Sequence, residues 1–272
     1  MISFPKAKIN LGLRITSKRP DGFHDIETIF YPIGLTDALE FVEICRPASH
    51  DHLKVTGMEL ESPPENNLVM KAVDILRERY HFPLLSIHLH KVIPSGAGLG
   101  GGSSDGACMI KALSKKYNMQ LTVGEMKMLA LELGSDCPFF IDCTPSAATG
   151  RGEKLKPVEP LLKGYYLVLA NPGIHISTKE AYSNCRPTQP ATSLEEQYNS
   201  PVEEWKKLIF NDFESYVFRK FPKVGNLKDL FYASGAVYAS MTGSGSSVFG
   251  IYREKPKVSA ALGRHLVWEG YL

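Results

Sequence analysis

A glycine-rich segment stands out in the first half of the 272-residue chain, where residues 94–104 read Pro94-Ser95-Gly96-Ala97-Gly98-Leu99-Gly100-Gly101-Gly102-Ser103-Ser104. It follows a strand-like run, Leu85 to Ile93, and precedes a helical pattern from Asp105 to about Tyr117. Glycine has no Cβ, so the backbone N–H groups of such a segment can approach an anion closely. The helix behind it adds unpaired N–H donors and the positive end of a dipole. The order of strand, glycine loop and helix therefore predicts a phosphate-binding loop.

Other phosphate loops fit this segment less well. A loop of the GxxxxGK[ST] type requires a lysine after the glycines, and none follows here. Gly96, Gly98 and Gly101 satisfy GxGxxG, but the acidic residue at a suitable spacing, Glu125, is better explained as a helix-capping residue. A protein-kinase loop needs HRD and DFG triplets, which the sequence lacks. A flexible connector with a serine cap remains the plain structural alternative.

The N-terminal region alternates strictly between apolar and polar residues from Lys8 to Thr16. Side chains along a strand point to opposite faces in turn, so the pattern predicts a half-buried strand. Lys8 and Asn10 then share its polar face, together with Arg14. The sequence therefore predicts that a lysine and an amide lie side by side.

The chain mixes helical and strand-like runs without a steady strand–helix alternation, which favours an α+β fold. Further strands are predicted at Tyr165 to Ala170, Val237 to Met241 and Val248 to Tyr252. Turn residues cluster just after residue 156. We therefore expect two domains, residues 1–156 and residues 157–272.

Composition excludes several classes of protein. The net charge is +2, from 31 basic and 29 acidic residues, so neither nucleic acid nor a membrane surface is expected as the main partner. The five cysteines form no CxxC pair, which argues against a disulfide framework or a zinc knuckle. The N-terminus lacks the apolar run of a signal peptide, and no segment is long enough to span a bilayer. We expect a cytoplasmic protein with reduced thiols.

Six motifs occur in collinear order along the chain. The glycine loop matches P-x-x-x-G-L-G-[GS]-[GS]-S-[SA] at Pro94 to Ser104. The other five motifs are Pro5-Lys6-Ala7-Lys8-Ile9-Asn10-Leu11, Arg19-Pro20-Asp21-Gly22-Phe23-His24, Leu133-Gly134-Ser135-Asp136-Cys137-Pro138, Gly150-Arg151-Gly152-Glu153 and Thr242-Gly243-Ser244-Gly245. Together they resemble the GHMP kinase superfamily and, within it, the family of diphosphocytidyl-methylerythritol kinases.

This resemblance implies a reaction and a fold. ATP, arriving with Mg²⁺, would phosphorylate the 2-hydroxyl of 4-diphosphocytidyl-2-C-methyl-D-erythritol in the non-mevalonate isoprenoid route. The fold would be a two-domain α+β GHMP kinase, with a ribosomal-protein-S5-like N-terminal domain that binds ATP along residues 94–104 and a ferredoxin-like C-terminal domain that binds substrate. The partner would be this small molecule, and the protein a monomer or a homodimer.

The resemblance also implies residue roles. Lys8 and Asp136 match the catalytic pair, in which the aspartate orients the attacking hydroxyl and the lysine offsets its charge. Asn10 and His24 match positions that contact the substrate. By the residues alone, Asp136 is as readily an ordinary turn residue and Lys8 a solvent-facing strand lysine. Nothing in the sequence itself brings these two side chains together.

Two aromatic positions and one turn complete the implied site. Phe23 and Tyr182 match the pair that sandwiches the cytosine, although tyrosine is commoner than phenylalanine at the first position. Gly243 and Gly245 lie in a turn that would hold the diphosphate by close backbone approach. Each of these also has a structural alternative, as a core aromatic or a hairpin turn. Gly106 departs from the family pattern, where alanine is commoner.

The sequence leaves several other functions open. One is another GHMP kinase acting on homoserine, mevalonate or a sugar; others are a non-catalytic nucleotide-binding protein and an NAD(P)-dependent oxidoreductase. His50 with His52 and His88 with His90 pair on strand faces, but no third ligand follows at a useful spacing. We therefore expect no protein-bound zinc and assign no metal ligand.

Overall fold

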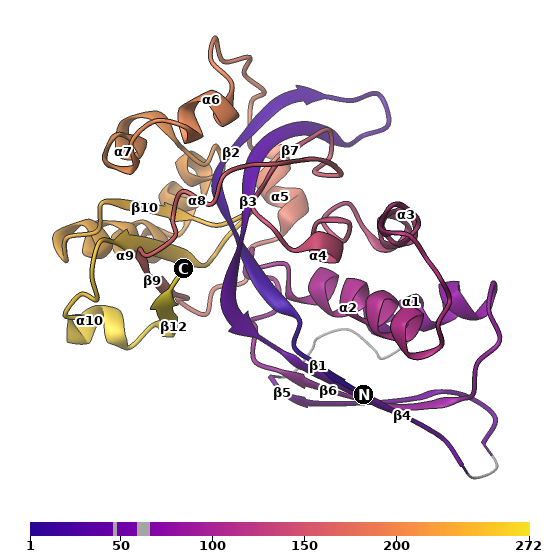
Figure 1. Cartoon of the computed structure of the whole chain (residues 1–272). Coiled ribbons are helices and arrows are strands. Elements are labelled where there is room, and N and C mark those ends of the chain that lie inside the picture. Colours follow the sequence, from indigo (N-terminus) through magenta and orange to yellow (C-terminus); the bar gives the residue numbers. More distant parts are fainter. Residues whose placement is uncertain (46–47, 59–65) are drawn as a thin grey trace. The chain divides into compact units, whose positions relative to one another are not determined.

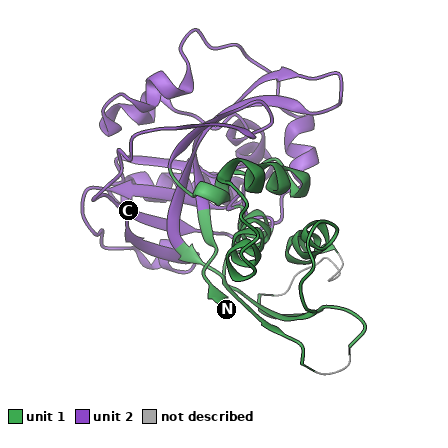
Figure 2. Cartoon of the chain, turned by 45° about the vertical axis from the view of Figure 1, so that its right-hand side comes forward, with its two compact units in different colours: residues 1–7, 35–95, 100–144 green, residues 8–34, 96–99, 145–272 purple. Residues whose placement is uncertain are grey.

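The computed structural model describes residues 1–45, 48–58 and 66–272. These residues form two compact units, coloured separately in Figure 2. Unit 1 draws on residues 1–7, 35–95 and 100–144, and unit 2 on residues 8–34, 96–99 and 145–272. The chain thus passes several times from one unit to the other. The expected division of roles between residues 1–156 and 157–272 stays a prediction.

Unit 1 contains a four-stranded sheet in the order β1-β4-β6-β5. Strand β6 pairs antiparallel with β4 and parallel with β5. Alternate residues of β4 and β6 are buried, because one face of this sheet packs against helices. The strands are β1 (Ile2–Ser3), β4 (Ala38–Glu43), β5 (His52–Gly57) and β6 (Leu85–Lys91).

Helices cover one face of this sheet (Figure 1). They are α1 (Leu68–Arg77) and α2 (Gly101–Lys116), on which α3 (Val123–Leu133) and α4 (Phe139–Asp142) pack in turn. Asn67 caps α1 by accepting a hydrogen bond from the N–H of Val69. Thr122 and Glu125 form the predicted capping box of α3, and both main-chain N–H groups of that box are satisfied.

Helix α2 begins earlier than the sequence predicts. The glycines at 101 and 102 and the two serines after them form its first turn, so the expected start at Asp105 is wrong. Gly100 precedes the helix with φ +70°, a left-handed conformation that glycine adopts at little cost. Further along, a Cβ at Gly106 would lie 3.0 Å from Leu68 Cβ and 3.0 Å from Leu133 Cδ1. Glycine at 106 therefore allows α2 to pack closely on its neighbours.

Unit 2 holds most of two further sheets. One has the order β2-β3-β7-β8, and the other, which is antiparallel throughout, has the order β10-β11-β9-β12. The strands of the first are β2 (Lys6–Lys18), β3 (His24–Thr36), β7 (Ser146–Thr149) and β8 (Lys154–Pro157). Those of the second are β9 (Tyr166–Ala170), β10 (Tyr238–Met241), β11 (Val248–Tyr252) and β12 (Leu266–Tyr271). The three C-terminal strands predicted from sequence are confirmed.

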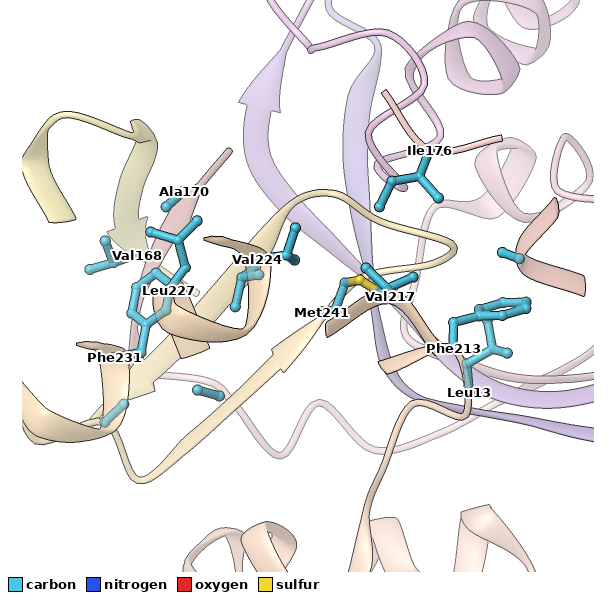
Figure 3. Close-up of a cluster of buried hydrophobic side chains, with 14 of the residues drawn as sticks. Leu13, Val168, Ala170, Ile176, Phe213, Val217, Val224, Leu227, Phe231 and Met241 are labelled. Atoms are coloured by element: carbon cyan, nitrogen blue, oxygen red, sulfur yellow. The ribbon is translucent and has the colours of Figure 1, made fainter. Parts of the chain in front are cut away.

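The helices of unit 2 follow β9. They are α5 (Thr178–Ser183), α6 (Leu194–Tyr198), the 3₁₀ turn η2 (Val202–Glu204), α7 (Trp205–Leu208), α8 (Glu214–Lys220), α9 (Pro222–Ala233) and α10 (Ala260–Gly263). Figure 3 shows side chains of α8 and α9, such as Val217, Val224 and Phe231, within the apolar core of this unit. This burial packs α9 against β10 and β11, and α8 against α9.

Strand β2 departs from the expectation of a half-buried strand. Its apolar face is buried as predicted, but Lys8 is only 3% exposed, Asn10 1% and Arg14 8%. The expectation failed because these polar side chains find hydrogen-bond partners, which removes most of the penalty for leaving water. Lys8 and Asn10 do share one face, as the alternation predicts.

Within residues 1–45, 48–58 and 66–272, every helix falls short of the length and apolar character that a bilayer-crossing helix requires.

Candidate active site

The Lys8 ammonium is held from several directions within unit 2. Its Nζ donates to Asn10 Oδ1 over 2.5 Å and to the main-chain oxygen of Gly98 over 3.1 Å. It also lies 5.0 Å from the centroid of the Phe30 ring. The main-chain N–H of Lys8 donates to Leu99 O over 3.0 Å. Both the backbone and the charged end of Lys8 are thus bound to the glycine loop.

Asn10 is oriented by a second set of hydrogen bonds. Its Nδ2 donates to Thr28 Oγ1 over 2.8 Å, and that hydroxyl donates to Gly12 O over 2.6 Å. The side-chain nitrogen of Asn10 is therefore committed to β3. This leaves Oδ1 facing the Lys8 ammonium, which is the favourable orientation of the amide dipole.

Thr242, in the turn after β10, contacts both Asn10 and Gly98. Its Oγ1 accepts from the main-chain N–H of Asn10 over 3.0 Å and lies 2.9 Å from Gly98 O and 3.2 Å from Asn10 Oδ1. We call Lys8, Asn10, Thr28, Gly98 and Thr242 the lysine network. Thr242 was not among the predicted site residues, although it opens the Thr-Gly-Ser-Gly motif. Its position before two glycines was the available signal.

The glycine loop meets the turn after β10 at van der Waals distance. Gly98 has φ +77°, and a Cβ there would overlap Thr242 O. A Cβ on Gly243 would lie 3.0 Å from Gly98 Cα. Both positions therefore require glycine, for backbone conformation at Gly98 and for close approach at both. Four predicted residues, Lys8, Asn10, Gly98 and Gly243, are thus brought together.

The second part of the glycine loop opens helix α2 in unit 1. The N–H groups of a helix's first turn have no intrahelical acceptors, so they are available to an anion. The side chain of Ser103, in this turn, lies close to the thiol of Cys137. Burial raises the pKa of that thiol to about 12, so it stays neutral. Asp136 immediately precedes Cys137, in the turn between α3 and α4, and therefore lies near the start of α2.

A buried cluster of one lysine and two aspartates includes the first part of α2. The Lys91 ammonium, at the end of β6, donates to Asp37 and, over 2.6 Å, to Asp105 Oδ2. Asp37 Oδ1 accepts from the N–H groups of Val92, over 2.5 Å, and Ile93, over 2.8 Å, which lead into the glycine loop. The cluster thus connects the strand before the loop to the helix after it. Sequence reasoning missed it because its members lie far apart along the chain.

Asp105 is the least satisfied member of that cluster. Its Oδ1 is buried and has no hydrogen-bond partner among the described residues. Burial raises the pKa of this carboxyl to about 7, since Lys91 is shared with Asp37 and offsets only part of the cost. The pKa of the Asp105 carboxyl therefore lies well above that of an exposed aspartate.

The aromatic residues predicted to hold a base lie at the other end of β2 and β3. Phe23 is 53% exposed, and the Arg151 guanidinium carbon lies 4.9 Å from its ring centroid. His24 stacks on Tyr182, with ring centroids 5.0 Å apart and an interplanar angle of 25°. The edge of Tyr182 meets Phe213, with centroids 4.9 Å apart. The rings of His24 and Phe213 therefore orient the Tyr182 ring, whereas more than half of the Phe23 surface is accessible to solvent.

Two of the sequence motifs meet at this aromatic group. Ile26 N–H donates to Gly150 O over 2.7 Å, which joins the start of β3 to the Gly-Arg-Gly-Glu motif. Glu153 Oε2 accepts from Arg151 N–H over 2.6 Å and closes that turn. Burial, and to a lesser degree the nearby Lys18 charge, lowers the pKa of His24. His24 is therefore neutral at pH 7 and can donate or accept a hydrogen bond.

The turn after β10 also reaches helix α5, which carries Tyr182. Thr178 Oγ1 and Ser244 Oγ lie 3.1 Å apart and share a hydrogen bond. Gly245 has φ +90°, and a Cβ there would lie 2.7 Å from Met241 Sδ. The turn thus lies between the lysine network and the aromatic group. Gly243 and Gly245 are both held in conformations that glycine favours.

Candidate metal ligands do not gather in the described part of the chain, where no three His, Cys, Asp or Glu side chains form a group that could hold an ion. His88 Nε2 and His90 Nδ1 instead lie 2.8 Å and 3.0 Å from the hydroxyl of Thr56.

Comparison with known proteins places the chain in a family. The model of the GHMP kinases N terminal domain matches residues 67–144, and that of the GHMP kinases C terminal region matches residues 194–266. The 4-diphosphocytidyl-2-C-methyl-D-erythritol kinase of Parabacteroides distasonis is 50% identical over 100% of both chains. The chain belongs to this kinase family.

Other similar proteins belong to the same kinase family. The 4-diphosphocytidyl-2-C-methyl-D-erythritol kinase of Bacteroides fragilis is 48% identical across 95% of this chain and 94% of its own. A crystal structure of 4-(cytidine 5'-diphospho)-2C-methyl-D-erythritol kinase superposes with a TM-score of 0.76 at 31% identity, covering 92% of this chain and 90% of that one. The resemblance stated from the six motifs and the α+β GHMP kinase fold are therefore confirmed.

The close approach of Gly98 to Thr242 can be tested by stability. Gly98→Ala should lower the free energy of unfolding more than Gly164→Ala. Gly164 has φ +86° with no described atom within 4 Å of an added Cβ, so its variant carries only the left-handed backbone cost of about 1–2 kcal/mol. At Gly98 the new Cβ also meets main-chain oxygen. Denaturant unfolding compares the two; equal losses would contradict the packing described here.

Proposed function

We propose that this protein transfers the γ-phosphoryl group of ATP to the 2-hydroxyl of 4-diphosphocytidyl-2-C-methyl-D-erythritol. The main support is the buried Lys8 ammonium of the lysine network, held against a glycine loop in a chain of this kinase family. A positive charge kept at such a loop suits a reaction in which negative charge passes between oxygens. The alternative phosphate acceptors are the substrates of other GHMP kinases: homoserine, mevalonate and sugars.

ATP binds with its triphosphate along Pro94 to Ser104. The N–H groups at the start of α2 provide donors that need no side-chain charge. Mg²⁺ keeps several water ligands and is commonly bound through the phosphates of its nucleotide. It therefore enters with ATP, and we assign no side chain to it.

Asp136 orients the attacking hydroxyl and receives its proton. A carboxylate is too weak a base to ionise an alcohol in advance, so the proton leaves late, as the phosphorus–oxygen bond forms. Lys8 offsets the negative charge that forms on the hydroxyl oxygen. Such proton-transfer assistance contributes roughly 10²- to 10⁴-fold to the rate.

The cytidylyl end of the substrate stacks between Phe23 and Tyr182, next to His24. Base–aromatic stacking contributes about 1–3 kcal/mol per base. Asn10 contacts the substrate through Oδ1, the oxygen that also accepts from Lys8. The turn with Gly243 and Gly245 helps to position the erythritol diphosphate. Residues 1–156 form the ATP-binding and catalytic domain, which also supplies Asn10, Phe23 and His24 to the substrate. Residues 157–272 form the substrate-binding domain, in a cytoplasmic monomer or homodimer.

A panel of alcohols tests the substrate. ADP release should be fast with 4-diphosphocytidyl-2-C-methyl-D-erythritol and at least about 100-fold slower with homoserine, mevalonate and galactose, because those lack the base that the aromatic group binds. A coupled ADP assay measures this. Turnover of another alcohol in the panel, without turnover of the cytidylyl compound, would overturn the proposed substrate.

The role of Asp136 is tested by a matched pair of variants. Asp136→Asn should lower kcat by at least about 100-fold and leave KM for the cytidylyl substrate within a few fold, because the amide retains shape but cannot accept the proton. Asp142→Asn is the control, since Asp142, the last residue of α4, forms an ion pair with Lys127 of α3. Steady-state kinetics compares the two variants. A kcat near that of the parent protein in Asp136→Asn would remove this residue from the mechanism.

A further inference from the structure

The segment from Phe210 to Glu214, which leads into α8, contacts β2 through its backbone. Leu13 N–H donates to Phe210 O over 3.0 Å, and Asp212 N–H donates to Leu13 O over 2.8 Å. The side chain of Asp212 accepts from Ile15 N–H over 2.8 Å. Strand β2 carries Lys8 and Asn10, so this segment is fixed to the strand that supplies them.

Asn211 lies in the middle of that segment and contacts the turn after β10. Its Nδ2 donates to Met241 O over 2.9 Å and to Gly243 O over 2.8 Å. Its Oδ1 accepts from Phe213 N–H over 3.0 Å. The side chain is 2% exposed, and both of its N–H donors are used. Asn211 therefore holds the carbonyls on either side of Thr242.

Glu214 strengthens the same attachment from the first residue of α8. Its Oε1 accepts from Met241 N–H over 2.8 Å and from Ser240 Oγ over 3.0 Å. Its Oε2 accepts from the Lys228 ammonium over 2.6 Å, which balances the charge. The end of β10 is thus bound by two buried side chains of one short segment.

These contacts have a geometric consequence for the lysine network. Two fixed carbonyls, at Met241 and Gly243, determine the backbone direction at Thr242 between them. That direction aims Thr242 Oγ1 at Gly98 O and at Asn10. The Asn211 side chain touches none of the groups proposed to react, yet it sets the residue that joins the glycine loop to β2.

We infer that Asn211 is a positioning residue for phosphoryl transfer, acting through Thr242 on the lysine network. The inference deepens the proposed function and rests on it, because it assigns the placement of the Lys8 ammonium to a residue outside the reacting groups. Misplacement by about 1 Å can cost 100-fold in rate without removing any reacting group. The role is thus distinct from that of Lys8 or Asp136.

Asn211→Asp is the most informative variant. The carboxylate has nearly the same shape, but it turns an oxygen toward the two carbonyl oxygens that Asn211 Nδ2 binds. We expect kcat to fall about 10- to 100-fold, with a smaller change in KM for ATP. Asn211→Ser keeps one hydrogen-bond donor, so its kcat should lie between those of Asn211→Asp and the parent protein. It replaces Asn211→Asp in the test if that variant does not fold.

A control must separate positioning from lost stability. Val224→Ala removes two methyl groups from a fully buried residue of α9 in the apolar core of unit 2, a residue that is not a member of the lysine network. It should lower the free energy of unfolding while keeping kcat within about twofold of the parent value, because a core cavity lowers stability without moving the reacting groups. All variants are assayed well below their melting temperatures.

Amide hydrogen exchange gives a readout that does not require activity. Asn10 N–H donates to Thr242 Oγ1, and Gly245 N–H donates to Thr242 O. Both amides should exchange faster in Asn211→Asp and at the parent rate in Val224→Ala. This comparison tests the structural link between Asn211 and the lysine network even if the enzyme acts on another alcohol.

The outcomes separate the two claims. If the parent protein phosphorylates none of the panel, the proposed function fails, and the exchange rates still test the link. If the parent is active but Asn211→Asp keeps its kcat, or loses no more than Val224→Ala, Asn211 has no positioning role. Faster exchange at Asn10 together with a selective loss of kcat supports the inference.

Discussion

The buried ammonium of Lys8 constrains much of the site. Taking a charge out of water is costly unless polar partners replace the solvent. Asn10 Oδ1 and Gly98 O replace it here, and the ring of Phe30 lies close by. Strand β2, the glycine loop and the turn after β10 must therefore meet at one place. Glycine at 98 follows from this meeting, since any larger residue would separate the loop from Thr242.

Local patterns gave a sound prediction of the elements and of part of the site. Alternation in β2 correctly put Lys8 and Asn10 on one face, because side-chain direction depends only on strand geometry. The capping box of Thr122 and Glu125 could also be predicted, because it depends only on two residues that are three positions apart. The order of strand, glycines and helix located the loop, although its helix starts at Gly101 rather than at Asp105.

Long-range contacts explain what the sequence could not show. Thr242 and Asn10 are 232 residues apart, and Lys91 and Asp37 are 54 apart. A polar residue with a distant partner looks the same in sequence as one that faces water. The burial of β2's polar face was missed for that reason, as was Asn211. The family resemblance supplied roles for Lys8 and Asp136, but it gave no account of which side chains hold them.

The hydroxyl of Thr242 offers the most direct test of the lysine network. Thr242→Val keeps the shape and removes only the group that joins Asn10 to Gly98, so kcat with ATP and the cytidylyl substrate should fall at least about 10-fold. Thr149→Val, at an exposed position on β7, should leave kcat unchanged. A Thr242→Val enzyme with the kcat of the parent protein would show that the network does not position Lys8 for phosphoryl transfer.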